Sequence, residues 1–171
     1  MIRRHLNGAI LVGSLLASLS ASLPARAVGV GDPAPDFSLP ALDDRVMITL
    51  ADHRGKVVYL DFWSSWCLPC RISLPLLSAM RDELSGENFE IVAIDVDRIP
   101  KDGRDFLKRY PASYPVASDS TGETAERYNL VGMPTSFIID REGIVRHVHT
   151  GFEENDIEEI RAQLEALIGE N

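Results

Sequence analysis

Residues 61–70 read DFWSSWCLPC, and they follow a run of apolar residues that begins at Val57. From position 57 to 63 the run is interrupted only by Asp61, a pattern typical of a strand buried on both faces. Beyond Cys70 the apolar residues recur at helical spacing, at Ile72, Leu76, Met80 and Leu84. The stretch therefore predicts a buried strand, a short loop and a helix, with both cysteines at the junction.

The elements on either side favour a single α/β domain over residues 28–171. A second buried strand is expected at 89–96, which completes a right-handed β-α-β unit. Pro and Gly punctuate the region before the first buried strand, which predicts a short edge strand with a hairpin partner at 46–50. Further along, the patterns predict helices at 102–110, 123–128 and 155–168, an extended piece at 114–116, and a hairpin of strands 135–140 and 144–150.

The first 27 residues differ in composition from the rest. Arg3 and Arg4 precede a serine-interrupted apolar stretch, and the segment ends in Ala25-Arg26-Ala27, which fits a small-x-small cleavage site. A spanning helix prefers about 20 predominantly apolar residues. We interpret 1–27 as a cleavable secretory signal, with an uncleaved membrane anchor as the alternative. The protein is then expected in the periplasm or another extracytoplasmic space, touching a membrane only through this segment if it is retained.

The charge of the chain argues against nucleic acid as a partner. Its formal net charge is −9. Removing segment 1–27, which holds three arginines and no acid, takes this charge to −12. An acidic domain without a basic face is a poor match for a phosphate backbone.

Cys67 and Cys70 are the only cysteines of the 171 residues. A bridge closing so short a loop would constrain the unfolded chain little, so a purely structural disulfide explains the pair poorly. Disulfide exchange needs a thiolate that attacks and a second thiol that resolves the mixed disulfide. At a helix N-terminus, Cys67 would meet unpaired N–H groups, which lower a thiol pKa. We predict Cys67 as nucleophile and Cys70, less exposed, as the resolving thiol.

Asp61 stands six residues before Cys67, inside the apolar strand. A buried charge is costly unless it is paired or functional, and burial raises the pKa of a carboxyl. We predict Asp61 as the proton acceptor for the resolving thiol. The alternative is an aspartate at the strand end that is solvated or bonded to nearby backbone.

Three further residues stand out, two near the cysteines and one before the strand predicted at 135–140. Trp66 adjoins the nucleophile and offers apolar contact surface, whereas Trp63 is expected in the core. Pro69 is tolerated in a first helical turn, where its missing N–H would lack a partner anyway. Pro134 cannot donate to a strand ladder, and a cis peptide would suit a sharp turn there, although most X-Pro bonds are trans.

Together these motifs resemble the TlpA/ResA-like family of exported thioredoxin-fold thiol-disulfide oxidoreductases. Residues 61–70 resemble the thioredoxin active-site stretch, and Pro75 matches the proline that kinks the following helix. Met133-Pro134-Thr135 resembles the cis-proline loop, which lies beside the cysteines and, with Trp66 and Pro69, is implied to contact substrate. The resemblance implies a thioredoxin-like fold, with a central mixed β-sheet flanked by helices and an N-terminal β-hairpin extension.

The resemblance also implies partners. It implies a reductase of disulfides in exported proteins, recharged by a membrane thiol-transfer protein. Clients would be apocytochrome c, during cytochrome c-type biogenesis, or copper-site assembly proteins. Ser73 and Thr135 stand where members dedicated to cytochrome maturation often carry Glu. These departures leave the client open and the thiol chemistry unchanged.

Two other functions fit parts of the sequence. A copper-binding chaperone could combine the cysteines with His147 or His149, but similar chaperones space their cysteines by three residues. Zinc would need a second cysteine pair, which the chain lacks. A peroxiredoxin-type peroxidase wants a lone peroxidatic cysteine rather than a close pair. We therefore expect an oxidoreductase with no resident metal or other cofactor.

Overall fold

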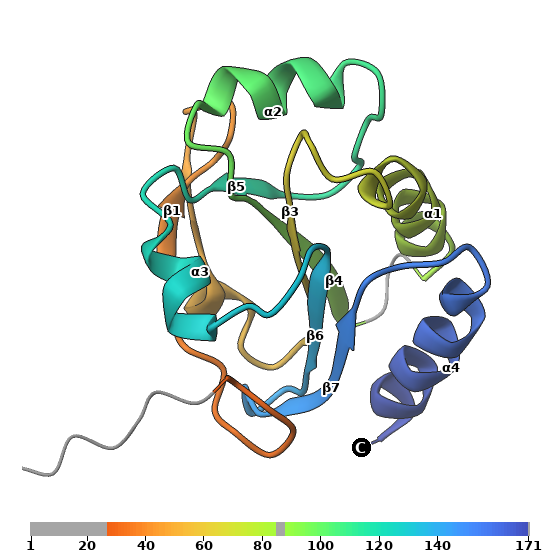
Figure 1. Ribbon diagram of the computed structural model, residues 1–171. Coiled ribbons are helices and arrows are strands. Elements are labelled where there is room, and N and C mark those ends of the chain that lie inside the picture. The colour runs from red at the N-terminus through yellow and green to blue at the C-terminus, as the bar shows by residue number, and fades with distance from the viewer. Residues whose placement is uncertain (1–26, 85–87, 171) are drawn as a thin grey trace, which may run out of the picture.

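The computed structural model describes residues 27–84 and 88–170 (Figure 1). The predicted secretory signal lies outside these residues, apart from Ala27. Within the described ranges, no helix combines the length and the apolar character that crossing a bilayer requires.

A five-stranded mixed sheet forms the centre of the fold, in the order β5-β4-β3-β6-β7. The middle strand β3 (Val57–Trp63) is parallel to β4 (Phe89–Asp95) and antiparallel to β6 (Thr135–Ile139). At the edges, β5 (Val116–Ser118) runs parallel to β4 and β7 (Val145–Thr150) antiparallel to β6. Every residue of β3 is buried, as its apolar run predicts.

Helices cover both faces of this sheet and create two cores. On one face lie α1 (Cys70–Glu83), α2 (Pro100–Leu107) and α4 (Asp156–Gly169), with α1 and α4 side by side in Figure 1. The short α3 (Glu123–Tyr128) packs on the other face. Side chains alternate along β3, so Tyr59, Asp61 and Trp63 share the α1 face while their neighbours enter the second core.

The predicted N-terminal hairpin is confirmed as a separate two-stranded sheet. It consists of β1 (Ser38–Pro40) and β2 (Met47–Thr49), followed by the 3-10 helix η1 (Leu50–His53). An antiparallel bridge between Ala41 and Ala117 joins this hairpin region to β5. The hairpin therefore extends the fold beside the sheet rather than adding a regular edge strand to it.

Two predicted elements are displaced along the chain. The helix expected at 102–110 begins at Pro100 and ends at Leu107. Proline is favoured at a first helical position, which explains the earlier start. The extended piece expected at 114–116 is strand β5 at Val116–Ser118. Pro115 has no N–H to give to a ladder, so regular pairing begins after it.

Candidate active site

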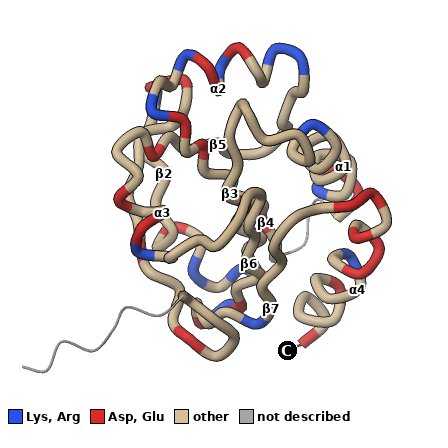
Figure 2. Tube along the Cα trace, viewed as in Figure 1, with Lys and Arg blue, Asp and Glu red and all other residues tan. Residues whose placement is uncertain are grey.

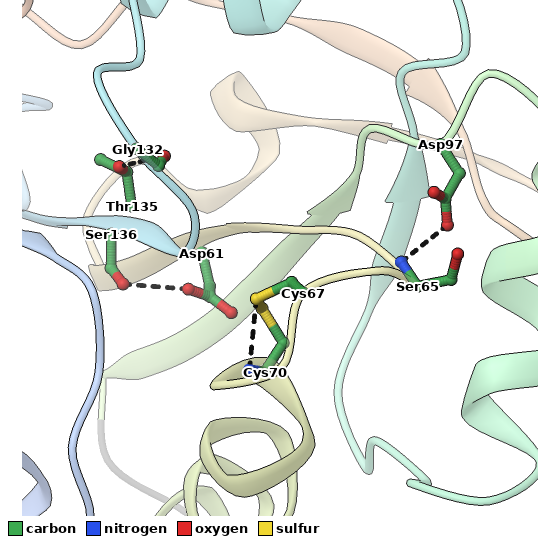
Figure 3. The surroundings of a disulfide bond; sticks show 8 residues. All are labelled: Asp61, Ser65, Cys67, Cys70, Asp97, Gly132, Thr135 and Ser136. Carbon is green, nitrogen blue, oxygen red and sulfur yellow. Dashed lines mark hydrogen bonds between the residues drawn. A yellow bond between two sulfur atoms is a disulfide. The ribbon is translucent and has the colours of Figure 1, made fainter.

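Cys67 and Cys70 form a disulfide where the chain passes from β3 into α1 (Figure 3). Their Cα atoms lie 5.4 Å apart, a normal separation for such a bridge. The backbone N–H of Cys70 donates to the Sγ of Cys67 at 3.2 Å. Cys67 keeps 3% of its surface exposed and Cys70 none, which agrees with the predicted order of exposure. A helix N-terminal N–H is therefore in place to stabilise a thiolate at Cys67.

Asp61 lies on the α1 face of β3, and its carboxyl points toward the disulfide (Figure 3). The residue is 1% exposed, and its Oδ1 accepts a hydrogen bond from the Ser136 hydroxyl at 2.9 Å. Its Oδ2 has no hydrogen-bond partner among the described residues. Burial raises the pKa of Asp61 to about 7, although the bond from Ser136 opposes this. Asp61 is thus a buried, side-chain-bonded acid, not the solvated or backbone-bonded residue of the alternative interpretation.

The structure adds Ser136 and Tyr59, which the sequence analysis missed. Ser136 lies directly opposite Asp61 in the register of β6 against β3. The hydroxyl of Tyr59 donates to Ser136 Oγ at 2.9 Å. Burial and the nearby Asp61 raise the pKa of Tyr59, so it remains a protonated donor. Two sequence features could have found them: Tyr59 stands two positions before Asp61 and so shares its face, and Ser136 is a small polar residue in an apolar strand.

The Met133–Pro134 peptide bond is cis and leads directly into β6. Pro134 and Thr135 are buried, whereas Met133 is half-buried. The hydroxyl of Thr135 donates to the carbonyl oxygen of Gly132 at 2.8 Å, which closes the loop. Thr135 pairs with Phe62 of β3, one position from the Asp61–Ser136 pair. The fold therefore places this loop beside the strand end from which the disulfide loop departs.

A largely apolar surface surrounds the disulfide, although Arg71, directly after Cys70, is exposed. The flanking segments 64–70 and 129–135 contain no charged residue (Figure 2). Trp66, Leu68, Ile72 and Val131 are all exposed, Trp66 to 66% and Val131 to 76%. Trp66, Val131 and Met133 line an open hollow of about 600 Å³ beside α3. Of the two tryptophans, Trp63 is in the core as predicted, and Pro69 is half-buried immediately before α1.

A second carboxyl group holds the loop before the nucleophile. Asp97 accepts a hydrogen bond from the Ser65 N–H at 2.8 Å, as Figure 3 shows. The N–H of Asp97 in turn donates to Oδ1 of Asp95 at 3.1 Å. Burial raises the pKa of Asp95 to about 8. The end of β4 thus carries another buried acid, connected to the active-site loop through Asp97.

The two histidines considered for copper lie apart from the cysteines in the sheet order. Both are on β7, and β6 separates this strand from β3. His149 contacts Gln163 of α4, with 2.8 Å between Nε2 and Oε1. Burial lowers the pKa of His147. The described residues contain no cluster of three or more His, Cys, Asp or Glu that could hold a metal ion.

Comparisons with known proteins agree with this geometry. Residues 30–148 match the AhpC/TSA family. Thiol-disulfide oxidoreductase ResA of Bacillus thuringiensis is 36% identical over 116 residues, which are 68% of this chain and 66% of that protein. The ResA of Geobacillus thermodenitrificans is 33% identical over 159 residues, 90% of each chain.

Solved structures share the fold as well. A candidate thiol:disulfide interchange protein DsbE from Chlorobium tepidum is 43% identical, with a TM-score of 0.80 over 84% of this chain and 100% of that one. StoA from Bacillus subtilis, at 23% identity, shows the same fold with a TM-score of 0.64 over 75% of this chain and 96% of its own. The chain therefore belongs to the AhpC/TSA family of thioredoxin-fold proteins, as a ResA-like thiol-disulfide oxidoreductase.

Proposed function

We propose that this protein reduces disulfides in exported proteins through the Cys67–Cys70 dithiol. The observation that carries the proposal is the disulfide at the N-terminus of α1, with the free oxygen of buried Asp61 directed at it. The names of the relatives support thiol-disulfide chemistry. The reducing direction, the residue roles and the location outside the cytoplasm are our proposals.

The reaction begins with the thiolate of Cys67. It attacks one sulfur of the substrate disulfide, whose S–S bond breaks as the first substrate sulfur leaves as a thiolate. Cys70 then gives its proton to Asp61 and attacks the Sγ of Cys67. The second substrate thiolate leaves, the Cys67–Cys70 disulfide forms, and two electrons have passed to the substrate. A membrane thiol-transfer protein restores the dithiol by the same exchange chemistry.

Asp61 suits the proton step because of its surroundings. A general base works best when its pKa lies near the operating pH. Burial brings the pKa of Asp61 to about 7, so the group can exchange a proton near neutrality. Its unpartnered Oδ2 is the acceptor, since Oδ1 is already bonded to Ser136.

The surface around the disulfide favours a polypeptide substrate. Exposed Trp66 and Leu68 offer apolar contacts to a polypeptide chain. We propose that Met133, Pro134 and Thr135 hold the extended substrate backbone. Exported clients of this kind include apocytochrome c and copper-site assembly proteins. Segment 1–27 would deliver the protein to the same compartment, the periplasm or an equivalent space.

The test is to trap the client. In Cys70→Ser, attack by Cys67 still occurs but resolution does not, so mixed disulfides with exported proteins should accumulate in cells. Cys67→Ser, the matched control, should trap nothing and should lose insulin-type reduction completely. Non-reducing electrophoresis followed by mass spectrometry of the released partner identifies the client.

Several outcomes would contradict the proposal. Activity retained in Cys67→Ser would refute the assigned roles. A redox potential near that of DsbA, about −120 mV, rather than near that of thioredoxin, about −270 mV, would refute the reducing direction. Rapid peroxide consumption without any disulfide partner would indicate a peroxidase instead.

A further inference from the structure

Ser136 connects two buried groups that come from different parts of the chain. Its Oγ lies 2.9 Å from Oδ1 of Asp61 and 2.9 Å from the hydroxyl of Tyr59. All three residues are at least 97% buried. A serine hydroxyl has one proton to donate, and Tyr59 already donates to Ser136. The Ser136 proton is therefore directed to Asp61, and the chain of bonds runs from Tyr59 through Ser136 to the carboxyl.

This chain leaves the two oxygens of Asp61 in different situations. Oδ1 is engaged by Ser136, while Oδ2 has no partner among the described residues and faces the disulfide (Figure 3). No other described side chain donates a hydrogen bond to Asp61. Rotation of the carboxyl would break the bond to Ser136 in a site shielded from bulk solvent, where an unmade hydrogen bond is costly.

We propose that Ser136, supported by Tyr59, is a positioning residue that turns the Asp61 carboxyl so that its free oxygen meets the proton of Cys70. The proposal rests on the proposed role of Asp61. Ser136 is the second residue of β6, and Pro134 directly precedes this strand. The bond therefore also ties the proton acceptor to the segment proposed to hold the substrate.

Among the described groups around Asp61, Ser136 is the one that stabilises the charged carboxylate by a hydrogen bond. Tyr59 on β3 and Tyr114 before β5 face the carboxyl, and burial raises the pKa of both phenols, so neither is charged. The negative charge of Asp156, at the start of α4, also raises the pKa of Tyr59. On the neighbouring strand β4, the residue in register with Asp61 is Ala93. A hydrogen bond to the carboxylate favours the charged form, so Ser136 holds the pKa of Asp61 below the value that burial alone would give.

A single-turnover assay separates the two thiol steps. One equivalent of an aromatic chromogenic disulfide is mixed with the reduced full-length protein across a range of pH. Cys67 releases the first aryl thiolate, and resolution by Cys70 releases the second. In Ser136→Ala the acid limb of the second release should move to higher pH by about one to two units, the usual effect of one hydrogen bond to a charged group. The first release should keep its profile.

Related variants test whether the pH shift is caused by the hydrogen bonds from Tyr59 through Ser136 to Asp61. Tyr59→Phe should move the second release in the same direction by less, because hydrogen bonds in a chain polarise one another. It also provides the test if Ser136→Ala does not fold. Ser136→Thr keeps a hydroxyl and should restore the normal profile. Ser118→Ala, the matched control, removes another buried strand serine whose Oγ has no described partner, and should shift nothing.

The Asp61→Asn background separates two kinds of failure. There, adding Ser136→Ala should cause no further shift of the second release. A shift of the same size in both backgrounds, or no shift with Asp61 present, would overturn the positioning role alone. If Asp61→Asn itself leaves the profile of the second release unchanged, the proposed function of Asp61 fails, and the positioning role fails with it.

Discussion

The ends of β3 and β4 carry the same pair of residue types, a buried aspartate opposite a buried serine on the next strand. Asp61 of β3 lies opposite Ser136 of β6, and Asp95 of β4 lies opposite Ser118 of β5. Burial raises the pKa of Asp61 to about 7 and that of Asp95 to about 8. Yet only the first pair is hydrogen-bonded, since the Oγ of Ser118 and the Oδ2 of Asp95 have no described partner.

The difference comes from what each carboxyl faces. The Oδ1 of Asp95 accepts the N–H of Asp97, so this carboxyl is bonded to its own chain and not to Ser118. Its Oδ2 lies under α2, where a Cβ added to Gly103 would be only 2.1 Å away. Asp61 instead faces the Cys67–Cys70 disulfide at the start of α1 (Figure 3). A raised pKa alone therefore does not identify a catalytic acid, because packing can enclose the same group away from any reacting atom.

The largest expected effect is on the proton step. Asp61→Asn should slow the second thiol release about 100-fold at about pH 7, because a positioned general base typically contributes that much. Asp95→Asn, the matched change at the other pair, should leave the rate within about twofold. Stopped-flow measurement of both variants checks this. An equal loss of rate in both variants would mean that the two acids act as one functional unit, and that the different surroundings of Asp61 and Asp95 do not separate their roles.

The next effect is on stability, and its sign follows from the raised pKa of Asp95. The folded state retains the proton up to about pH 8, whereas the unfolded state loses it near the ordinary value of 3.8. The free energy of unfolding should therefore fall as the pH rises from about 4 to 8. Asparagine does not titrate and can accept the same N–H. The stability gain of Asp95→Asn over the natural protein should thus grow by up to about 1.4 kcal/mol for each pH unit across this range.

Denaturant unfolding of the oxidised protein at several pH values measures this gain. No gain is expected below about pH 4, where both states of the natural protein hold the proton. Asp61→Asn should show the same sign, with its window closing near pH 7. Parallel stability curves for Asp95→Asn and the natural protein would show that Asp95 is already ionised in the fold.

The local sequence predicted the parts of the site that depend on neighbouring residues. The apolar run gave β3, the four-residue spacing gave α1, and the cysteine pair with Asp61 followed from their places in these elements. The Tyr59–Ser136–Asp61 chain was missed because it needs the antiparallel register of β3 against β6, two segments about 75 residues apart. The cis bond at Pro134 was likewise undecided from the residues, since X-Pro preferences are weak.

The smallest expected effect contrasts the two serines. Ser136→Ala leaves the buried hydroxyl of Tyr59 without its acceptor, so it should cost about 1–2 kcal/mol of unfolding free energy. Ser118→Ala removes a hydroxyl that has no described partner, so its effect should stay within about 0.5 kcal/mol, in either direction. Denaturant unfolding of both variants at one pH measures these two changes in the free energy of unfolding. A cost above 1 kcal/mol in Ser118→Ala would mean that its hydroxyl is satisfied by bound water, and that the Asp95 pair is a polar network after all. A negligible cost in both would instead place the value of Ser136 in orienting Asp61 rather than in holding the fold.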